Sequence, residues 1–371
     1  MLRRMLVLST FALAALSQAS VAYYRSYGPR SVTRLARPTV TWEVWPSEGG
    51  RVTGWDLRIN NRKVRATYDS GRRELQFTPD YDLDTGDYAV SAKVTVDGSL
   101  TVSRAWSFRV SSEKIGKLAP PSEKQVLLLQ EINSARSVLG LAPALLDDRL
   151  DASASAHTSY LKRNRQSGHF EQEGAPGFSG NAPADRMEAF GYFGSSYEDV
   201  CTGAFSLREG MKMLFDAPYH RIPFMAPGQP LVGGAYENGA LTLQFGVSEA
   251  TRVVVSPAPN QPGLPLTWDQ PENPNPLRLY DVRGQIGYPV VFAAFGVEEP
   301  IRVSDASLTD GFGNSVPFYL NSPANDDHLE NAAFVLPKKP LRAGTLYSVT
   351  VRATDATGRD ISKSWSFTTR S

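Results

Sequence analysis

One phrase of aromatic and small residues occurs near both ends of the chain. Tyr88 is followed 18 residues later by Trp106, and Tyr347 is followed 18 residues later by Trp365, each time with the tryptophan in the sequence Trp-Ser-Phe. Apolar and polar residues alternate around each tyrosine, which is the pattern of a β-strand with one buried face. The recurrence predicts two related β-sandwich modules, one near each end of the chain. We expect the aromatic side chains to pack between the sheets, with carbohydrate binding as the alternative.

Between these modules the apolar residues recur with the period of a helix. Leu128, Ile132, Ala135 and Leu139 lie at spacings of four, three and four, and Gly140 follows them. This stripe predicts a helix with one buried face. The same reasoning predicts three more helices and one hairpin, marked by Asp147-Asp148, Pro183, Ser206, Pro218 and Asn238-Gly239. The middle of the chain is therefore expected to be mixed α+β, unlike its flanks.

The N-terminus has the composition of an export signal. Arg3 and Arg4 precede the apolar stretch Met5–Leu16, and Ser20 and Ala22 are small residues placed for cleavage after Ala22. This order is typical of a secretory signal peptide. The apolar stretch is too short to span about 30 Å of hydrocarbon, so we expect no transmembrane anchor. The predicted location is secreted, periplasmic or at the cell surface.

Together these patterns predict a multidomain fold, in which a central α+β region is flanked by two all-β, immunoglobulin-like (Ig-like) sandwiches. Repeated proline removes backbone donors and favours extended chain, so the proline-rich segment is expected to be an ordered strap. The expected segments are a signal peptide (1–22), a short polar linker (23–37), an N-terminal β-sandwich (38–112), the α+β domain (122–255), the strap (256–289) and a C-terminal β-sandwich (290–371).

Charge and cysteine content exclude some classes of function. The 39 basic and 38 acidic residues are spread evenly and give a formal net charge of +1. A nucleic-acid-binding protein needs a concentrated basic face, so this class is excluded. Cys201 is the single cysteine, and the chain can form no internal disulfide. We expect its thiol to be a small buried apolar group rather than a nucleophile.

Titratable side chains gather in the α+β region. His169 follows Gly168 in a predicted loop, His220 follows the fourth helix, and Glu198 and Asp199 form an acidic pair between them. Two histidines and a carboxylate can bind a divalent metal or share protons. Spacing alone does not decide between these uses, because the chain contains no HExxH, CxxC or GxSxG motif.

The other two histidines have simpler interpretations. His157 lies on the apolar stripe of the second helix, so we expect a core histidine whose hydrogen bonds are satisfied. His328 stands next to two aspartates and is expected in a solvated loop.

Eight short motifs follow one another along the α+β region in a specific order. They are Glu131–Arg136, Gly140–Pro143, Leu150–His157, Gly168-His169-Phe170, Asp185-Arg186, Gly191-Tyr192, Tyr197-Glu198-Asp199 and Pro218–Arg221. Their order and spacing resemble bacterial members of the CAP superfamily, also called SCP-like domains. The strap, through Glu272–Leu277 and Gly287-Tyr288-Pro289, also resembles a segment that follows some bacterial CAP domains.

The resemblance implies an α-β-α sandwich with a cleft lined by two histidines and two acidic residues. Carried over to this chain, these are His169, His220 and Glu198, with Asp216 as the nearest candidate for the second acid. The pattern departs from the family at Asp199, where asparagine is usual. It also departs at Leu214, where many members have tryptophan.

Three functions remain open at this point. The first is an exported, non-catalytic binding protein whose cleft takes a lipid, a cell-wall fragment or a divalent ion such as zinc. In that case the expected metal ligands are His169, His220 and Glu198, because the resemblance places them together. The second is a metal-assisted hydrolase that uses the same cleft, and no nucleophile motif supports it. The third is a structural protein of the cell envelope, in which the β-modules matter most.

Overall fold

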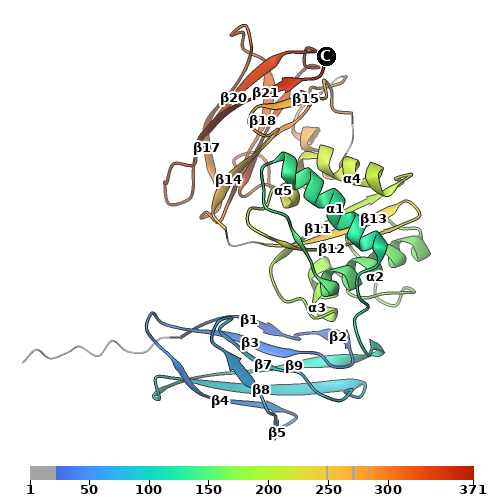
Figure 1. Cartoon of the computed structure of the whole chain (residues 1–371), viewed down its shortest axis with the longest axis vertical. Coiled ribbons are helices and arrows are strands. Elements are labelled where there is room, and N and C mark those ends of the chain that lie inside the picture. Colours follow the sequence, from blue (N-terminus) through green and yellow to red (C-terminus); the bar gives the residue numbers. More distant parts are fainter. Residues whose placement is uncertain (1–21, 248–249, 270–271, 283) are drawn as a thin grey trace, which may run out of the picture.

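The computed structural model describes residues 22–247, 250–269, 272–282 and 284–371. Three parts follow one another along the long axis of the molecule, with the N-terminal β-sandwich at one end, the α+β domain in the middle and the C-terminal β-sandwich at the other end (Figure 1). Apart from Ala22, the predicted signal peptide lies outside the described residues. Within these ranges no helix combines the length and the apolar content that a membrane span requires.

The N-terminal β-sandwich consists of two sheets around a core that includes Trp42, Leu57 and Leu75. The first sheet has the order β1 (Ala22–Gly28), β3 (Val40–Pro46), β7 (Glu74–Phe77) and β6 (Thr67–Asp69). The second has the order β2 (Val32–Leu35), β9 (Leu100–Ile115), β8 (Gly86–Val96), β4 (Val52–Ile59) and β5 (Arg62–Lys63).

The C-terminal β-sandwich is built in the same way around a core that includes Phe292, Val351 and Phe367. One sheet has the order β14 (Arg252–Ser256), β16 (Val290–Phe295), β19 (Ala332–Pro337) and β18 (Phe318–Asn321). The other has the order β15 (Gln261–Leu264), β21 (Lys363–Thr369), β20 (Leu346–Thr354) and β17 (Arg302–Asp310), and a short 3-10 helix, η1 (Pro276–Leu279), lies in the strap.

The repeated aromatic phrase has the same place in both modules. Tyr88 on β8 pairs with Phe108 on β9, and Tyr347 on β20 pairs with Phe367 on β21. The two rings are stacked in each pair, with centroids 5.3 Å apart in the first module and 5.5 Å apart in the second. The tyrosine and the tryptophan of each copy belong to, or pack against, the core of their module. The predicted core packing is therefore confirmed.

Two predicted connections are wrong, because both contain strands. The expected linker 23–37 holds most of β1 and all of β2, and the expected strap 256–289 begins with the last residue of β14 and contains β15. The last residues assigned to the α+β domain also belong to β14, which pairs with β16 of the C-terminal sandwich. The polar and proline-rich composition hid these strands. β1, β2, β14 and β15 lie at sheet edges, where one side of the backbone needs no partner strand.

The α+β domain is an α-β-α sandwich. Its sheet has the order β10 (Leu145–Leu146), β12 (Leu231–Glu237), β13 (Ala240–Gly246) and β11 (Ser196–Thr202). One face packs mainly on α2 (Asp148–Asn164), next to which lies α3 (Pro183–Ala189). The other face packs on α1 (Glu123–Val138), α4 (Leu207–Asp216) and α5 (Pro218–Phe224).

Local signals produce most of these elements as predicted. Leu128 and Ile132 of the apolar stripe are buried beneath α1, and Asp147 accepts hydrogen bonds from the first backbone amides of α2. The turn between β12 and β13 is formed by Asn238 and Gly239, which both have positive φ.

Candidate functional site

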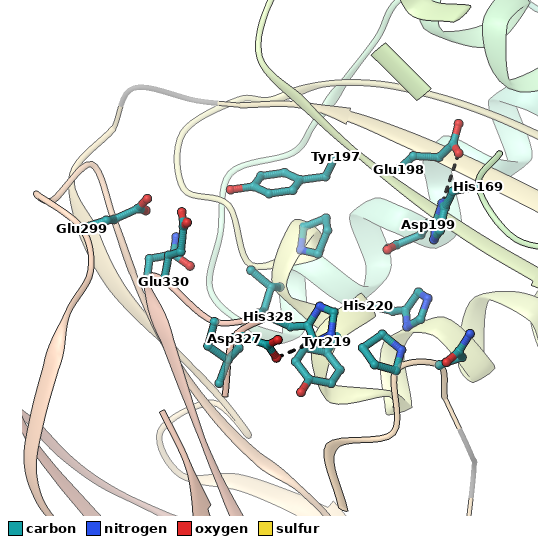
Figure 2. A pocket seen from close by; sticks show the side chains of 16 residues that line it. His169, Tyr197, Glu198, Asp199, Tyr219, His220, Glu299, Asp327, His328 and Glu330 are labelled. Atoms are coloured by element: carbon teal, nitrogen blue, oxygen red, sulfur yellow. Dashed lines mark hydrogen bonds and ion pairs between the residues drawn. The ribbon is translucent and has the colours of Figure 1, made fainter. Parts of the chain in front are cut away.

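Several titratable groups converge around β11, an edge strand of the central sheet. A cavity of about 350 Å³ opens there, and it is lined by residues of the α+β domain, the strap and the C-terminal sandwich. Alternation along β11 turns Glu198 toward the α2 side, whereas Tyr197 and Asp199 point into the cavity (Figure 2). Residues from both helical layers can therefore meet at this edge.

His169 reaches the cavity from the loop that follows α2. Its neighbour Gly168 has a φ of +92°, a conformation that glycine adopts without strain. The buried His157 donates from Nε2 to the carbonyl oxygen of Gly168 at 3.0 Å, and its Nδ1 lies 2.9 Å from Glu171 Oε1. The expectation that His157 is a satisfied core histidine is confirmed. It also anchors the loop that carries His169.

Glu198 is the buried centre of a polar network. Its carboxylate accepts from Arg186 Nη2 at 2.6 and 2.9 Å, from Gln244 Nε2 at 2.8 Å and from His169 Nδ1 at 3.2 Å. Burial works to raise the pKa of Glu198, but the hydrogen bond from His169 and the charge of Arg186 outweigh it and lower the pKa. The carboxylate therefore stays ionised and orients His169 instead of facing the cavity with free oxygens.

His220 reaches the cavity from the opposite helical layer. It is the third residue of α5, which Pro218 starts immediately after α4 ends. The adjacent Arg221 is fully buried and donates to the carbonyl oxygens of Phe215, Asp216 and Pro289 at 2.6, 2.8 and 2.9 Å. Because this guanidinium joins α4 to the C-terminal sandwich, the backbone that carries His220 is fixed.

The acidic partner of His220 is Glu272 in the strap. His220 Nδ1 lies 2.9 Å from Glu272 Oε2, and the same carboxyl accepts from the backbone N–H of Tyr219 at 3.2 Å. Burial works to lower the pKa of His220, but the hydrogen bond to Glu272 and the charge of that carboxyl group raise it overall. The sequence did not indicate Glu272 as a site residue, although the segment Glu272–Leu277 carries part of the resemblance to bacterial CAP proteins.

Asp216 does not fill the role of second acid. Its carboxylate accepts from Tyr288 Oη at 2.9 Å and pairs with Lys212, and it lines neither hollow that the two histidines share. The reason is its position in the last turn of α4, where it faces the junction with the C-terminal sandwich. The structure thus does not bring Asp216 together with the two histidines, and the carboxyl group beside His220 is that of Glu272.

The two cleft histidines share one arrangement. Each uses Nδ1 to meet a buried carboxyl group, Glu198 for His169 and Glu272 for His220. Within the described part of the chain, no hydrogen bond joins either Nε2 to a protein group. Both residues line the main cavity, and both also line a neighbouring hollow of about 300 Å³. Structure thus brings the predicted His169, Glu198 and His220 to one edge of the domain, and their role as ligands stays a prediction.

Asp199 lies between the two histidines and has an unusual environment. Its side chain is 3% exposed, and Oδ2 has no hydrogen-bond partner among the described residues. Burial raises the pKa of Asp199 to about 8, so the carboxyl group holds a proton at neutral pH. An acid in this state can donate to a ligand as well as accept from one.

The C-terminal sandwich supplies the other wall of the cavity. Tyr219 of α5 packs edge-on against Phe334 of β19, with ring centroids 4.9 Å apart, and its hydroxyl group contacts Asp326. Next to this contact, His328 lines the cavity and is about half exposed. The prediction of a solvated loop is correct for His328, but it missed that this loop faces the cleft.

Cys201 on β11 does not take part in this site as a nucleophile. Its sulfur lies 3.8 Å from the carbonyl oxygen of Gly210, and the side chain packs against the core below α4. Burial raises the pKa of the thiol to about 12, so almost no thiolate exists at neutral pH. This agrees with the expected small apolar role.

The side chains at the cleft offer few ligands for a divalent metal ion. No group of three or more His, Cys, Asp or Glu side chains is arranged to hold an ion anywhere in residues 22–247, 250–269, 272–282 and 284–371. The two free Nε2 atoms suit zinc in kind, and buried carboxylates behind histidine ligands are usual at zinc sites. An ion bound here would take its remaining ligands from solvent or from a second molecule.

The sequence was compared with protein families and with solved structures. Residues 129–245 match the family described as "CAP: Cysteine-rich secretory protein family". The chain contains a CAP domain. This confirms the predicted resemblance and the predicted fold class, in which a CAP domain lies between β-rich regions. A search of curated proteins gave no match.

Solved structures similar to parts of the chain include three proteins. An outer surface protein from Borrelia burgdorferi is 21% identical, with 36% of this chain and 98% of that chain covered and a TM-score of 0.29. An extracellular protein containing an SCP domain from Bacillus anthracis str. Ames is 11% identical, with 61% and 67% covered and a TM-score of 0.29. CopC from Methylosinus trichosporium is 20% identical, with 24% and 94% covered and a TM-score of 0.19.

Proposed function

We propose that this CAP-domain chain is an exported, non-catalytic binding protein whose cleft holds a small polar ligand or a divalent ion. The observation that carries the proposal is the matched pair of imidazoles at the edge of β11. Each has its Nδ1 committed to a buried carboxyl group, so each presents Nε2 to the same cavity. Side chains held in this way by a second layer of contacts are typical of ligand sites.

The lining of the cavity favours polar ligands over a lipid tail. Most side chains around it are histidines, carboxyl groups, tyrosines and asparagines, and the aliphatic side chains are few. An acyl chain needs a continuous apolar surface to gain from leaving water. Among the three ligands considered from the sequence, a cell-wall fragment or an ion is therefore better supported than a lipid.

Export is the second part of the proposal, and the N-terminal sequence supports it. Arg3, Arg4 and the apolar stretch Met5–Leu16 are followed by a cleavage motif that ends at Ala22. The full chain expressed in a bacterial host should yield a mature protein that begins at Tyr23. Intact-mass measurement of the exported fraction tests this, and an uncleaved N-terminus in that fraction would contradict it.

Zinc titration of the purified protein tests the binding site. Isothermal titration calorimetry should detect one zinc ion per chain, and His169→Ala or His220→Ala should each weaken binding by at least about tenfold, because each removes one of two protein ligands. His328→Ala is the matched control, since His328 lines the same cavity without a buried carboxyl group behind it. Zinc binding that is equally weak in all three variants, or absent from the parent protein, contradicts ion binding by the histidine pair.

A hydrolase is the second candidate, and one observation favours it. Asp199 is a protonated acid in the same cavity as His220, whose Nε2 is free. An acid and a base side by side can serve proton transfer to and from bound water. Hydrolysis of peptide, ester or peptidoglycan substrates that disappears in His220→Ala and Glu198→Ala would support this candidate. We expect the parent protein to turn over these substrates no faster than the double variant His169→Ala/His220→Ala does.

A further inference from the structure

The wall that the C-terminal sandwich contributes to the cleft carries unbalanced negative charge. Glu299 precedes β17 and Glu330 precedes β19, and the backbone N–H of Ile301 donates to the carbonyl oxygen of Glu330 at 2.8 Å. Burial raises the pKa of Glu299, and the charge of Glu330 and a hydrogen bond with it raise the pKa further. Both side chains line the cavity, and they lie on the same wall of it (Figure 2). Among the described residues, no ion pair neutralises either of them.

The opposite wall presents a buried oxygen that lacks a donor. Asp199 is 3% exposed, its Oδ2 has no hydrogen-bond partner among the described residues, and it points into the cavity (Figure 2). Buried polar atoms are almost always hydrogen-bonded, and leaving one without a partner costs about 1–3 kcal/mol. A donor on a bound molecule would supply what the protein does not.

Aromatic rings complete this part of the cavity. Tyr197 extends from β11 toward Glu299 and Glu330, and the ring of Tyr219 lines the floor on the other side (Figure 2). Carboxyl groups next to tyrosine rings are the combination that recognises organic ammonium groups, because both attract a positive charge. No lysine or arginine occurs among the described residues that line the cavity.

We propose that Asp199, Tyr197, Glu299 and Glu330 form a subsite for a primary ammonium group, shared between the CAP domain and the C-terminal sandwich. A metal ion fits this subsite less well, because no three acidic or histidine side chains in the described ranges converge at metal-ligand distance. An organic cation carries several N–H donors on a larger frame and can span the two walls. The volume of about 350 Å³ is sufficient for such a molecule.

The subsite deepens the proposed binding function, and it rests on that proposal because both place the ligand in one cleft. The subsite specifies that the ligand is positively charged, because at least one end of it must carry an amino group. It also assigns a role to the C-terminal sandwich, which is to complete the ligand site. An isolated CAP domain would lack the wall that carries Glu299 and Glu330.

A pair of probes that differ only in charge tests the subsite. The full mature chain is titrated with 1,5-diaminopentane and with 1,5-pentanediol, and binding is followed by NMR chemical shifts. The diamine is expected to bind and the diol to bind at least tenfold more weakly, and the affinity for the diamine should fall as salt is added. Equal binding of the two probes would overturn the proposal.

Variants locate the binding and separate it from the histidine site. Glu299→Gln/Glu330→Gln should weaken diamine binding at least tenfold, whereas Glu123→Gln, at an exposed position of α1 outside the cavity lining, should leave it unchanged. Asp199→Leu, which removes both oxygens, should also weaken diamine binding. Diamine binding that survives in the double variant, or that is lost equally in Glu123→Gln, contradicts the proposed subsite.

Zinc affinity in the same variants distinguishes the two proposals. Glu299→Gln/Glu330→Gln leaves both imidazoles and their carboxyl partners in place, so zinc should bind as it does to the parent protein. If the diamine fails to bind while zinc still depends on His169 and His220, the ammonium subsite is wrong and the histidine site stands. If zinc fails to bind while the diamine binds as expected, the reverse holds.

Discussion

His220 Nδ1 lies 2.9 Å from Glu272 Oε2, although the two residues are 52 positions apart and belong to different segments of the chain. Glu272 also accepts from the backbone N–H of Tyr219, so the strap contacts the start of α5 through two residues, Tyr219 and His220. The contact ties a cleft histidine of the CAP domain to the chain that continues into the C-terminal sandwich. The orientation of His220 therefore depends on residues outside 129–245, the range that matches the CAP family.

Glu272→Gln tests this dependence. Glutamine keeps the shape of the side chain but removes the negative charge that supports the imidazole. Loss of a carboxylate behind a metal-binding histidine typically lowers affinity about 10- to 100-fold, and we expect this range for zinc. Glu173→Gln, at an exposed position of the loop after His169, is the control and should bind zinc normally. Unchanged affinity in Glu272→Gln would show that the carboxyl group does not support His220.

The sheet and α2 lie very close together at Gly233 of β12. A methyl group at this position would overlap the backbone of Leu150 and Asp151. Gly233→Ala should therefore force α2 away from the sheet and destabilise the CAP domain by about 3 kcal/mol or more, as measured by urea unfolding. Gly54→Ala in β4 is the control, because the added methyl group there meets only ordinary contacts. A loss of less than about 1 kcal/mol for Gly233→Ala would mean that the helix and the sheet can separate freely.

Short-range patterns explain how much of this fold was predictable. The stripe through Leu128 and Ile132, the cap at Asp147 and the turn at Asn238-Gly239 each depend on residues within about one helical turn or one hairpin, so a single sequence reveals them. The interval from Tyr88 to Trp106 equals that from Tyr347 to Trp365, and this is likewise a local feature, because each interval joins two neighbouring strands.

The parts that were missed depend on contacts between distant segments. Glu272 is an isolated acidic residue in a proline-rich segment, and only the folded chain shows that it faces His220. Glu330 and His328 reach the cleft because β19 docks against Tyr219, and no local motif records that docking. The one available signal was the likeness of the segment Glu272–Leu277 to a segment that follows some bacterial CAP domains.

The two repeated tyrosines occupy equivalent positions but use their hydroxyl groups differently. Tyr347 is 2% exposed, and its hydroxyl group accepts from the backbone N–H of Arg342 at 2.8 Å. Tyr88 is partly exposed and donates to the carbonyl oxygen of Asp84 at 3.0 Å. Tyr347→Phe should cost about 1–2 kcal/mol of unfolding free energy, because it removes the hydroxyl group that accepts from the partly buried backbone N–H of Arg342. Tyr88→Phe should cost less than about 0.5 kcal/mol, since water can replace the lost partner. Equal costs in calorimetric unfolding would contradict this difference.

Asp151 on α2 makes the stability of the CAP domain depend on pH. The side chain is 2% exposed, Oδ1 accepts from the backbone N–H of Gly234 at 2.9 Å, and Oδ2 has no partner among the described residues. Burial raises the pKa of Asp151 to about 7. Between about pH 4 and pH 7 the folded chain keeps a proton that the unfolded chain has lost. The free energy of unfolding should therefore fall as pH rises through this window, by up to about 1.4 kcal/mol per pH unit from this group.

Asp151→Asn removes the charge and keeps an oxygen that can accept from Gly234. The variant should match the parent protein near pH 4 and exceed its unfolding free energy by roughly 2–4 kcal/mol at about pH 8. Hydrogen exchange of the α2 amides at several pH values measures the difference within the CAP domain. Asp148→Asn, at an exposed position in the first turn of the same helix, should instead lose about 0.3–1 kcal/mol through the helix dipole. An advantage of Asp151→Asn that is the same at both ends of this pH range would show that the carboxyl group does not titrate in the folded chain, and the stabilisation would then come from packing alone.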